Sequence, residues 1–384
     1  MHANTALPTQ QLIVVLGMHR SGTSAITRGL QVLGVALGDN LMPAIEGNNA
    51  KGFWEDLDIV NFNEELLSAV NSTWHNLNIL KNVDVDHLCN SGYLNRAIVI
   101  IKEKLSKYTI FGFKDPRTTK LLPFWTRAFS LIASQNVEIK YILSLRNPLS
   151  VASSLAKRNG FSPVKAYLLW IEHVLTSLSY ADLDAAIVVD YDQLMLRPEG
   201  EIHRISSHLG TELDPKELSR YCNDFIDSDL QHTVFQPKDI LLDKNAPELA
   251  YELYCYLYEM IRGDGAMNDS SRTGKLQVWE KEFHRLQPII RYSETLQSQI
   301  YIADESICQL NKKLDAQQGI ISELESQVKT LERSTDSLTT LAENRRELLS
   351  QAETNLNVIR SSLSWKITSP LRWLALKIKF SKSN

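Results

Sequence analysis

The sequence predicts an α/β domain with a central, largely parallel sheet between two helical layers, followed by a C-terminal α-helical coiled coil. Three observations lead to this prediction. Short runs rich in β-branched and aromatic residues alternate with helix-length amphipathic stretches, a glycine-rich turn follows the first of these runs, and a heptad of apolar residues begins near residue 296. Strands that alternate with helices form parallel sheets, because each helix returns the chain to the end of the sheet at which the previous strand began.

Four runs are predicted to be strands, because each is rich in β-branched or aromatic residues and too short for a buried helix. They are residues 11–17, 108–114, 139–145 and 185–191. Helices are expected between them, wherever apolar residues recur every three or four positions: 24–34, 56–70, 94–106, 118–134, 163–180 and 200–209. Parallel sheets of this kind bind ligands at the carboxyl ends of their strands, so candidate functional residues are sought there.

The overall composition excludes several classes of protein. The 384 residues carry a net charge of −4, so no basic field suggests a nucleic-acid partner. The four cysteines are scattered without a C-x-x-C pair, which argues against a disulfide framework or a zinc site and fits a reducing cytoplasm. The first residues, MHANTALPTQ, lack the basic region and apolar run of a signal peptide, and no apolar stretch approaches the roughly 20 residues that span a bilayer. We therefore expect a cytoplasmic protein without a metal, or one held peripherally at the inner face of the cytoplasmic membrane.

Apolar residues follow a heptad from residue 296 onward, with little proline or glycine. One seam position holds Ile300, Ile307, Leu314, Ile321, Val328, Thr335, Ala342, Leu349 and Leu356. The other holds Leu296, Ala303, Leu310, Gln317, Leu324, Leu331, Leu338, Arg345, Ala352 and Ile359. This pattern predicts a coiled coil that joins copies of the chain as a homo-oligomer, with a parallel dimer or trimer as the default. The alternative is a long helix folded back on the globular domain.

Composition and periodicity divide the chain into four predicted parts. These are an α/β domain over 1–240, a helical extension over 241–290, the coiled coil over 291–360 and a basic amphipathic tail over 361–384. The chain has no acidic residue after Glu353, and its last basic residues are interleaved with tryptophan, leucine, isoleucine and phenylalanine. Basic and aromatic residues on a short helix suit an anionic membrane surface. The alternative is a tail that packs on a partner chain.

The turn after the first predicted strand, GMHRSGTS at 17–24, has the features of an anion-binding loop. The first backbone N–H groups of a helix lack intrahelical acceptors, and the positive end of the helix dipole points at the ligand. Glycines let backbone amides approach an anion, while hydroxyl groups and a guanidinium add donors. The candidates are Gly17, Arg20, Ser21, Gly22, Thr23 and Ser24. Thr23 stands where a nucleotide-hydrolysing P-loop has lysine, so a P-loop-like site for a ligand without a γ-phosphate is expected. The alternative is a helix cap with no ligand.

A second anion site is predicted in LRNPLSVASS at 145–154. Arg146 ends a strand, Pro148 lies near the first turn of the next helix, and Ser154 follows Arg146 by eight residues. An arginine at the end of a strand and a serine two turns into the following helix can converge on one anion. The alternative is an Arg-Asn-Pro turn followed by a surface helix.

Together the two motifs resemble the nucleotide-binding motifs of sulfotransferases that use 3′-phosphoadenosine 5′-phosphosulfate (PAPS), in particular their bacterial and glycan-directed branch. The resemblance covers about residues 11–235 and includes FGFKDPRTTKLLPFW at 111–125 and YDQLMLRPEG at 191–200. It implies that the loop residues Arg20 to Ser24 bind the 5′-phosphosulfate of PAPS, and that Arg146 and Ser154 bind its 3′-phosphate. Many members of the family have lysine where Arg20 stands. The C-terminal tail resembles those of some bacterial glycan-modifying enzymes.

Sulfuryl transfer to an alcohol needs a base near the acceptor oxygen. The resemblance places a catalytic glutamate within residues 46–65, where we select Glu55; Phe53 and Trp54 beside it could shield the carboxylate and stack on a sugar. The alternative is that Glu55 only stabilises the start of a helix. Asp115 is the second candidate for the base. Arg20 is expected to stabilise charge on the bridging oxygen as the S–O bond breaks.

The predicted function is transfer of a sulfuryl group from PAPS to a hydroxyl group of a cell-surface glycan or lipid-linked saccharide, as in polysaccharide biosynthesis. The basic tail motivates the glycan acceptor, because such acceptors are made at the inner face of the membrane. The enzyme alternative is a P-loop kinase, which Thr23 disfavours. The non-enzyme alternative is a coiled-coil scaffold whose nucleotide-binding head has no catalytic activity.

Overall fold

The computed structural model describes the chain except for residues 1–9, 45–50, 78, 227–234, 263–268 and 381–384. The first residues of the segment predicted to carry the base, 46–50, and the last residues of the basic tail therefore lie outside the described residues. The chain divides into two compact units, Met1–Leu296 and Gln297–Asn384, which are described separately below.

The first unit is built on one parallel sheet. Its strands are β1 (Gln10–Leu16), β2 (Ile110–Lys114), β3 (Val137–Leu145) and β4 (Ala186–Asp190). They are arranged in the order β2-β1-β3-β4, and every neighbouring pair is parallel. All four predicted strands are confirmed, with ends that move by no more than about two residues. Because β1 is hydrogen-bonded to β2 and β3, the residues that follow these three strands emerge at one edge of the sheet.

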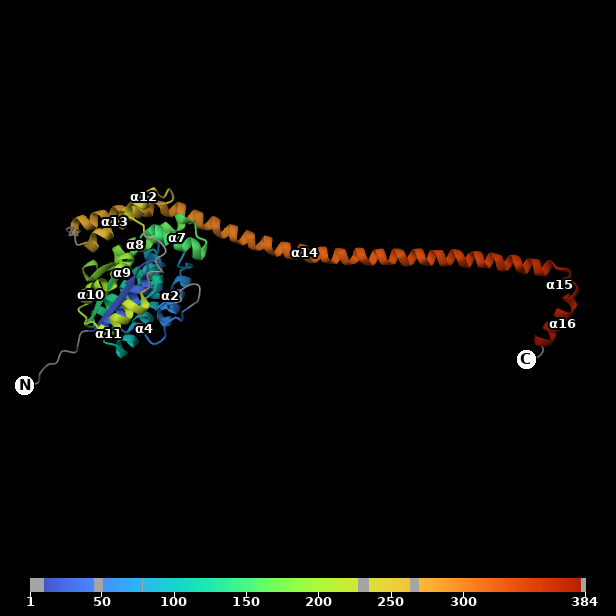
Figure 1. Cartoon of the computed structure of the whole chain (residues 1–384), viewed down its shortest axis with the longest axis horizontal. Helices are drawn as coiled ribbons and strands as arrows, with labels where there is room; N and C mark the ends of the chain where they lie inside the picture. Colours follow the sequence, from blue (N-terminus) through green and yellow to red (C-terminus); the bar gives the residue numbers. More distant parts are fainter. Residues whose placement is uncertain (1–9, 45–50, 78, 227–234, 263–268, 381–384) are drawn as a thin grey trace, which may run out of the picture. The chain divides into compact units, whose positions relative to one another are not determined.

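Helices connect and cover the strands (Figure 1). They are α1 (Thr23–Leu30), η1 (Gln31–Leu33), α2 (Leu57–Ala69), α3 (Asn82–Asn90), α4 (Tyr93–Lys107), α5 (Pro116–Lys120), α6 (Leu122–Ala133), α7 (Pro148–Asn159), α8 (Pro163–Tyr180), η2 (Leu183–Ala185), α9 (Tyr191–Leu196), α10 (Pro198–Leu209), α11 (Pro215–Arg220), η3 (Tyr221–Phe225), α12 (Pro237–Leu242) and α13 (Glu248–Arg262). Each of the six predicted helical ranges contains a helix. The range 118–134 is split into α5 and α6, because Pro123 near the start of α6 has no N–H to donate to the preceding turn.

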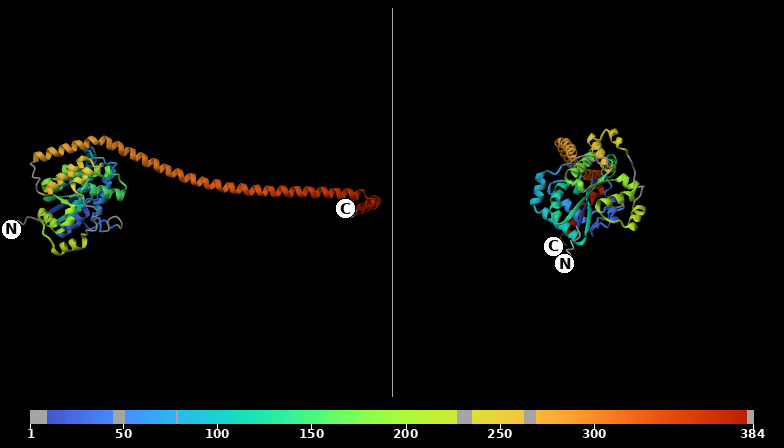
Figure 2. Two further views of the ribbon diagram at one scale, coloured as in Figure 1. Left: turned by 45° about the horizontal axis from the view of Figure 1, so that its top comes forward. Right: turned by 90° about the vertical axis from the view of Figure 1, so that its left-hand side faces the viewer.

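Alternate side chains of β1 enter two different cores, which is why helices are needed on both faces of the sheet. Leu12 and Val14 belong to a core shared with α2, α4, α6 and α8. Ile13 and Val15 point to the opposite face and belong to a core shared with α1, α9 and α10. The sheet therefore lies between two helical layers (Figure 2). The predicted three-layer α/β architecture with a parallel sheet is confirmed.

The segment after the α/β core is helical and packs on it. Leu249 and Leu253 of α13 are buried in the same core as α8. The helix α14 (Asp269–Ser361) begins within the first unit, where Trp279 and Phe283 are buried. Burial of these side chains ties the predicted helical extension to the α/β core. The four-part division of the chain itself stays a prediction.

The second unit consists of the remainder of α14 and two short helices, α15 (Leu363–Ile367) and α16 (Ser369–Phe380). The predicted long C-terminal helix is confirmed, since α14 has 93 residues. Its seam side chains beyond Leu296 are exposed, Ile307 and Leu324 among them. The prediction that copies of the chain pair along this seam stays a prediction. Within the described residues, the helices do not combine the length and apolar character needed to cross a membrane.

Candidate active site

The turn between β1 and α1 has the strained backbone of an anion-binding loop. Arg20 has a φ of 70° and Gly22 a φ of 87°, both in the left-handed region. At Gly22 only glycine fits, because a Cβ would also collide with the ring of Tyr191. Gly22 is the N-cap of α1 and supplies no side-chain acceptor to the first N–H groups of the helix. A helix start without a side-chain cap is suited to binding an anion.

Hydroxyl groups surround this loop. Ser21 is 1% exposed, and its Oγ has no hydrogen-bond partner within the described part of the chain. A buried hydroxyl group without a hydrogen bond destabilises the folded state, and a ligand that forms this hydrogen bond would offset the cost. Two other hydroxyl groups form hydrogen bonds with the backbone of the loop. Thr119 Oγ1 accepts from the N–H of Gly17 at 2.9 Å, and Ser144 Oγ donates to the carbonyl of Ser21 at 2.7 Å.

The two predicted anion motifs meet in space. Arg20 Nε donates to Ser154 Oγ at 2.8 Å, and Arg146 Nη1 donates to the carbonyl oxygen of Arg20 at 2.9 Å. The guanidinium of Arg146 also lies over the ring of Tyr191, 4.5 Å from its centroid. Residues from β1–α1, β3–α7 and α7 thus form one group, as expected for neighbouring strands of a parallel sheet.

This group carries two positive charges without a counter-ion. Neither Arg20 nor Arg146 has a carboxylate within ion-pair distance among the described residues. Burial and the neighbouring charge of Arg146 lower the pKa of Arg20. The Nε of Arg146 is buried without a hydrogen-bond partner in the described chain. Two close, half-desolvated guanidinium groups repel each other, so a bound dianion would stabilise them.

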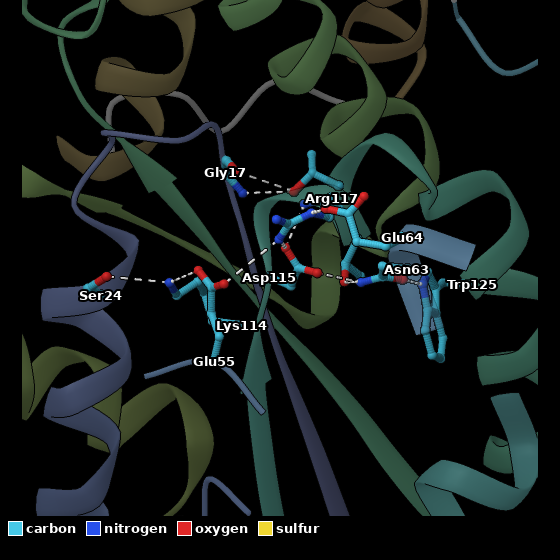
Figure 3. A network of polar contacts seen from close by, with 11 residues as sticks. Gly17, Ser24, Glu55, Asn63, Glu64, Lys114, Asp115, Arg117 and Trp125 are labelled. Atoms are coloured by element: carbon cyan, nitrogen blue, oxygen red, sulfur yellow. Dashed lines mark hydrogen bonds and ion pairs between the residues drawn. The ribbon is translucent and has the colours of Figure 1, made fainter. Parts of the chain in front are cut away.

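Glu55 is buried at the same edge of the sheet (Figure 3). It is 4% exposed, and its Oε1 accepts from Lys114 Nζ at 2.5 Å. Its Oε2 lies 3.8 Å from Arg117 Nη1, beyond hydrogen-bond distance. Burial raises the pKa of Glu55, while the charge of Lys114 opposes this shift. Lys114 also donates to Ser24 Oγ at 3.3 Å, which joins the carboxylate to the loop.

Asp115 is held differently. It is the N-cap of α5, and its Oδ1 accepts from the backbone N–H of Arg117 at 3.0 Å and from Arg117 Nη1 at 2.8 Å. Its Oδ2 accepts from Asn63 Nδ2 at 2.8 Å, and Trp125 holds Asn63 in turn. Both oxygens are occupied and the residue is fully buried, so Asp115 is suited to fixing Arg117 rather than to taking a proton.

Trp54 packs on side chains of α1 and η3. Its ring packs against the guanidinium of Arg28, 5.6 Å away, and edge-on against Phe225 at 6.1 Å. Its indole N–H donates to the carbonyl of Lys51 at 3.0 Å. Trp54 therefore contacts the helix layer of α1, and its stacking on a sugar stays a prediction.

Sequence reasoning missed several residues that complete the site. Thr119 and Ser144 hold the loop backbone, and Trp74 packs on His19 of the loop at 4.3 Å between ring centroids. Ser144 could have been noticed as a polar residue within an apolar strand. Trp74 lies in an irregular segment between α2 and α3, where no local pattern indicates its contact.

Other features of the first unit lie away from this site. A cavity of about 550 Å³ is lined by residues of α3, α8 and α14, and none of the predicted site residues is among them. Within the described ranges, the His, Cys, Asp and Glu side chains do not form groups of three or more that could hold a metal ion.

Comparison with known proteins gives one family match. The family model described as the sulfotransferase family matches residues 12–215. Among solved structures, the chain is similar to the sulfotransferase domain of the Synechococcus PCC 7002 olefin synthase, with 16% identity and a TM-score of 0.37 over 65% of this chain and 95% of that chain. It is also similar to the sulfotransferase domain from the curacin biosynthetic pathway (16% identity, TM-score 0.33, 56% and 78% covered) and to retinol dehydratase in complex with retinol and PAP (13% identity, TM-score 0.28, 73% and 82% covered). The search of curated proteins gave no match.

Proposed function

Because the chain belongs to the sulfotransferase family, we propose that it moves the sulfuryl group of PAPS to a hydroxyl group of a saccharide acceptor. The observation that carries the proposal is the convergence of Arg20, Arg146 and Ser154 beside a glycine-rich helix start. PAPS has an anionic group at each end of its ribose, and this arrangement offers donors for both. It needs no γ-phosphate, which agrees with Thr23 at the position of the P-loop lysine.

The chain's own residues fit such a ligand. The unpaired Oγ of Ser21 and the first N–H groups of α1 are donors for the 5′-phosphosulfate. The unpaired Nε of Arg146, together with Ser154, is suited to the 3′-phosphate. Bound PAPS supplies an activated sulfuryl group. Arg20 lies between the two donor sets and can stabilise charge on the bridging oxygen.

Glu55 is proposed to take the proton from the acceptor hydroxyl. Burial raises the pKa of Glu55 above its ordinary value, so its carboxylate is a stronger base than an exposed one. Lys114 fixes Oε1 and leaves Oε2 to face a hydroxyl. Lys114 also keeps the carboxylate beside Ser24 of the loop, close to where the sulfuryl group would be bound.

We infer that the acceptor belongs to a membrane-linked glycan and that the tail brings the enzyme to the membrane. On α15 and α16, Arg372 stacks on Trp365 and Lys377 on Trp373. Leu371 and Ile367 are about 70% exposed, which favours a partner that is both apolar and anionic. A bilayer with anionic lipids has this chemistry.

We also propose that copies of the chain pair through α14 as a parallel dimer. Where the seam is most regular, β-branched residues occupy one position and leucine the other: Ile307 with Leu310, Ile321 with Leu324, and Val328 with Leu331. This arrangement favours two strands in parallel coiled coils. The exposure of these side chains in one chain leaves the seam for a second copy.

The test of the proposed function begins with adenosine 3′,5′-bisphosphate (PAP) binding by calorimetry. We expect Arg146→Ala to weaken binding by at least about tenfold, since it removes charge-assisted hydrogen bonds to the 3′-phosphate. Arg127→Ala is the matched control, because Arg127 on α6 is exposed and pairs with Asp86 on α3. Unchanged PAP affinity in Arg146→Ala would remove the assignment of the 3′-phosphate.

Transfer itself is tested with radiolabelled PAPS and membrane or lysate fractions of the source cell. We expect label in a saccharide product and no magnesium-dependent turnover of ATP. Turnover of ATP would favour the kinase alternative. PAP binding without labelled product in any fraction would favour the non-catalytic scaffold.

A further inference from the structure

An aromatic cluster lies against the anion-binding loop. We use this name for His19, Trp74, His75 and Phe161. The rings of His19 and Trp74 are 4.3 Å apart, those of Trp74 and Phe161 5.7 Å, and those of His75 and Phe161 5.8 Å between centroids. Trp74 and Phe161 are half-buried, so part of each ring surface is accessible. The cluster joins the loop to the α2–α3 and α7–α8 connections.

Two cations flank this cluster. The guanidinium carbon of Arg158 lies 5.5 Å from the ring centroid of Trp74, and Lys165 Nζ lies 5.0 Å from that of Phe161. In the described part of the chain, neither has a carboxylate within ion-pair distance. Burial lowers the pKa of both. For Arg158 the pKa falls to about 10, because the charges of Arg20 and Arg117 add to burial and that of Glu55 only partly opposes it; for Lys165 the charge of Glu294 opposes the shift.

The buried lysines of the same unit, unlike Arg146, are neutralised within the protein. Three lysines have a carboxylate partner at short distance: Lys104 with Asp56 at 2.7 Å, Lys114 with Glu55 at 2.5 Å and Lys120 with Glu172 at 2.6 Å. Arg158 and Lys165 are half-buried and, like Arg20 and Arg146, have no carboxylate within ion-pair distance among the described residues, although Arg158 Nε donates to Asn159 Oδ1 at 2.6 Å. A desolvated cation that is not paired by the protein is stabilised by an anion from a ligand.

The aromatic cluster is also next to the place of transfer. Arg158 follows Ser154 by one helical turn on α7, and its pKa responds to the charges of Arg20 and Glu55. His19 belongs to the loop itself. Burial lowers the pKa of His19, so its imidazole stays uncharged and adds no third positive charge. A ligand on the cluster would therefore lie beside the bound sulfuryl group.

We propose that the aromatic cluster is the acceptor subsite and that it selects a saccharide bearing an acidic group. The apolar face of a sugar ring packs on Trp74 and Phe161, and a carboxylate or phosphate of the same saccharide binds Arg158 and Lys165. This inference rests on the proposed sulfuryl transfer and adds the chemical class of the acceptor. Neutral saccharides would leave both cations without a counter-ion and are selected against.

The experiment uses the full chain saturated with PAP, whose binding is first measured by calorimetry. Saturation-transfer difference NMR then compares methyl β-D-glucuronide and glucose 1-phosphate with neutral methyl β-D-glucoside. We expect at least one acidic probe to bind at least about fivefold more tightly than the glucoside, because its charge-assisted hydrogen bonds to Arg158 and Lys165 add to the affinity. The relative signals of the two acidic probes decide between carboxylate and phosphate.

The variant Arg158→Gln/Lys165→Gln should remove this preference and leave PAP affinity unchanged. Lys157→Gln is the matched control, since Lys157 is the exposed neighbour on the same helix. Equal binding of the glucoside, no binding of either acidic probe, or a preference that survives the double substitution would overturn the inference. A loss of PAP affinity in the double variant would show that these cations serve the nucleotide instead. Failure of the unaltered chain to bind PAP would instead refute the proposed function, and the acceptor subsite with it.

Discussion

At the scale of single residues, the site is decided by which charges are paired. Lys114 neutralises Glu55, and Asp115 neutralises Arg117. Arg20 and Arg146 lie together without a carboxylate in the described chain. Of the paired groups, Glu55 is suited to taking a proton and Asp115 to fixing Arg117, whereas the unpaired arginines are suited to binding an anion. This separation of tasks follows from the partners of each side chain rather than from residue type.

Substitution of Glu55 tests its assignment as the base. We expect Glu55→Gln to lower kcat by at least about a hundredfold while PAP affinity stays unchanged, because the amide can still accept from Lys114 but cannot take a proton. Activity of the unaltered chain should rise with pH through the pKa of Glu55, which burial places above the ordinary value. Glu64→Gln is the control, since Glu64 is half-exposed and also pairs with Arg117. A Glu55→Gln enzyme within about threefold of normal kcat would assign the base elsewhere.

Asp190 gives a prediction about stability. It caps α9 by accepting from the N–H of Gln193 at 2.8 Å, and burial raises its pKa to about 7. The native state then holds a proton that the unfolded chain releases, so the free energy of unfolding falls as pH rises from about 4 to 7. Asp190→Asn should flatten this dependence, a change of a few kcal/mol at most.

Urea unfolding followed by tryptophan fluorescence at several pH values measures this effect. Asp214→Asn is the matched control, because Asp214 caps α11 in the same way but is exposed. If Asp190→Asn and the unaltered chain lose stability in parallel between pH 4 and 7, Asp190 is not the titrating group.

At the scale of elements, strand ends and helix starts place the chemistry. β1 leads into the loop and α1, β2 ends at Lys114, and β3 leads into Arg146. Because these strands are parallel neighbours, their carboxyl ends bring residues distant in sequence to one edge. The long helix α14 behaves differently, since its seam is exposed, and we propose that a second copy packs on it.

The coiled-coil seam predicts the state of association. We expect the chain to sediment as a dimer, and Leu324→Asp/Leu331→Asp to make it a monomer, because the aspartates of the two chains would be buried opposite each other in both layers and repel across the seam. Ser326→Asp/Thr340→Asp adds the same charge on the outer face of the helix and should leave the dimer intact. Sedimentation equilibrium measures the mass. Equal masses for the seam variant and the unaltered chain would refute pairing through this seam.

At the scale of the whole molecule, charge and function are distributed unevenly along the chain. The first unit holds the anion-binding loop, Glu55 and the two hydrophobic cores on the faces of the sheet. The second unit holds the exposed seam and a tail without acidic residues. A net charge of −4 therefore conceals a positively charged C-terminal end. Catalysis belongs to the first unit, and we assign association and location to the second.

The basic tail predicts binding to anionic vesicles. We expect Lys366→Gln/Arg372→Gln/Lys377→Gln to weaken binding to vesicles containing phosphatidylserine by about a hundredfold, at about 1 kcal/mol for each charge. Co-sedimentation at low and high salt measures this, and neutral phosphatidylcholine vesicles are the control. PAP affinity should be unaffected. Equal binding of the unaltered chain to neutral and anionic vesicles would exclude an electrostatic role of the tail.

The sequence by itself determined the strands, most helices and the loop. Alternation of apolar residues is a local property, and the glycine at the start of α1 is required by a local φ of 87°. The helix α3 was not predicted, because only Val85 and Leu88 of that helix are buried and two apolar positions do not make a recognisable helical period. Periodicity along one helix also indicated the seam of α14 without any tertiary contact.

Only the tertiary structure decided how these parts combine. The contact of Arg20 with Ser154 joins residues 134 positions apart, and the pair of Lys114 with Glu55 joins residues 59 apart. The same holds for Trp74 and Phe161, which lie in two separate connections. The physical reason is that propensity and periodicity act within a few turns of the chain, whereas the pairing of charges and rings depends on the order of strands in the sheet.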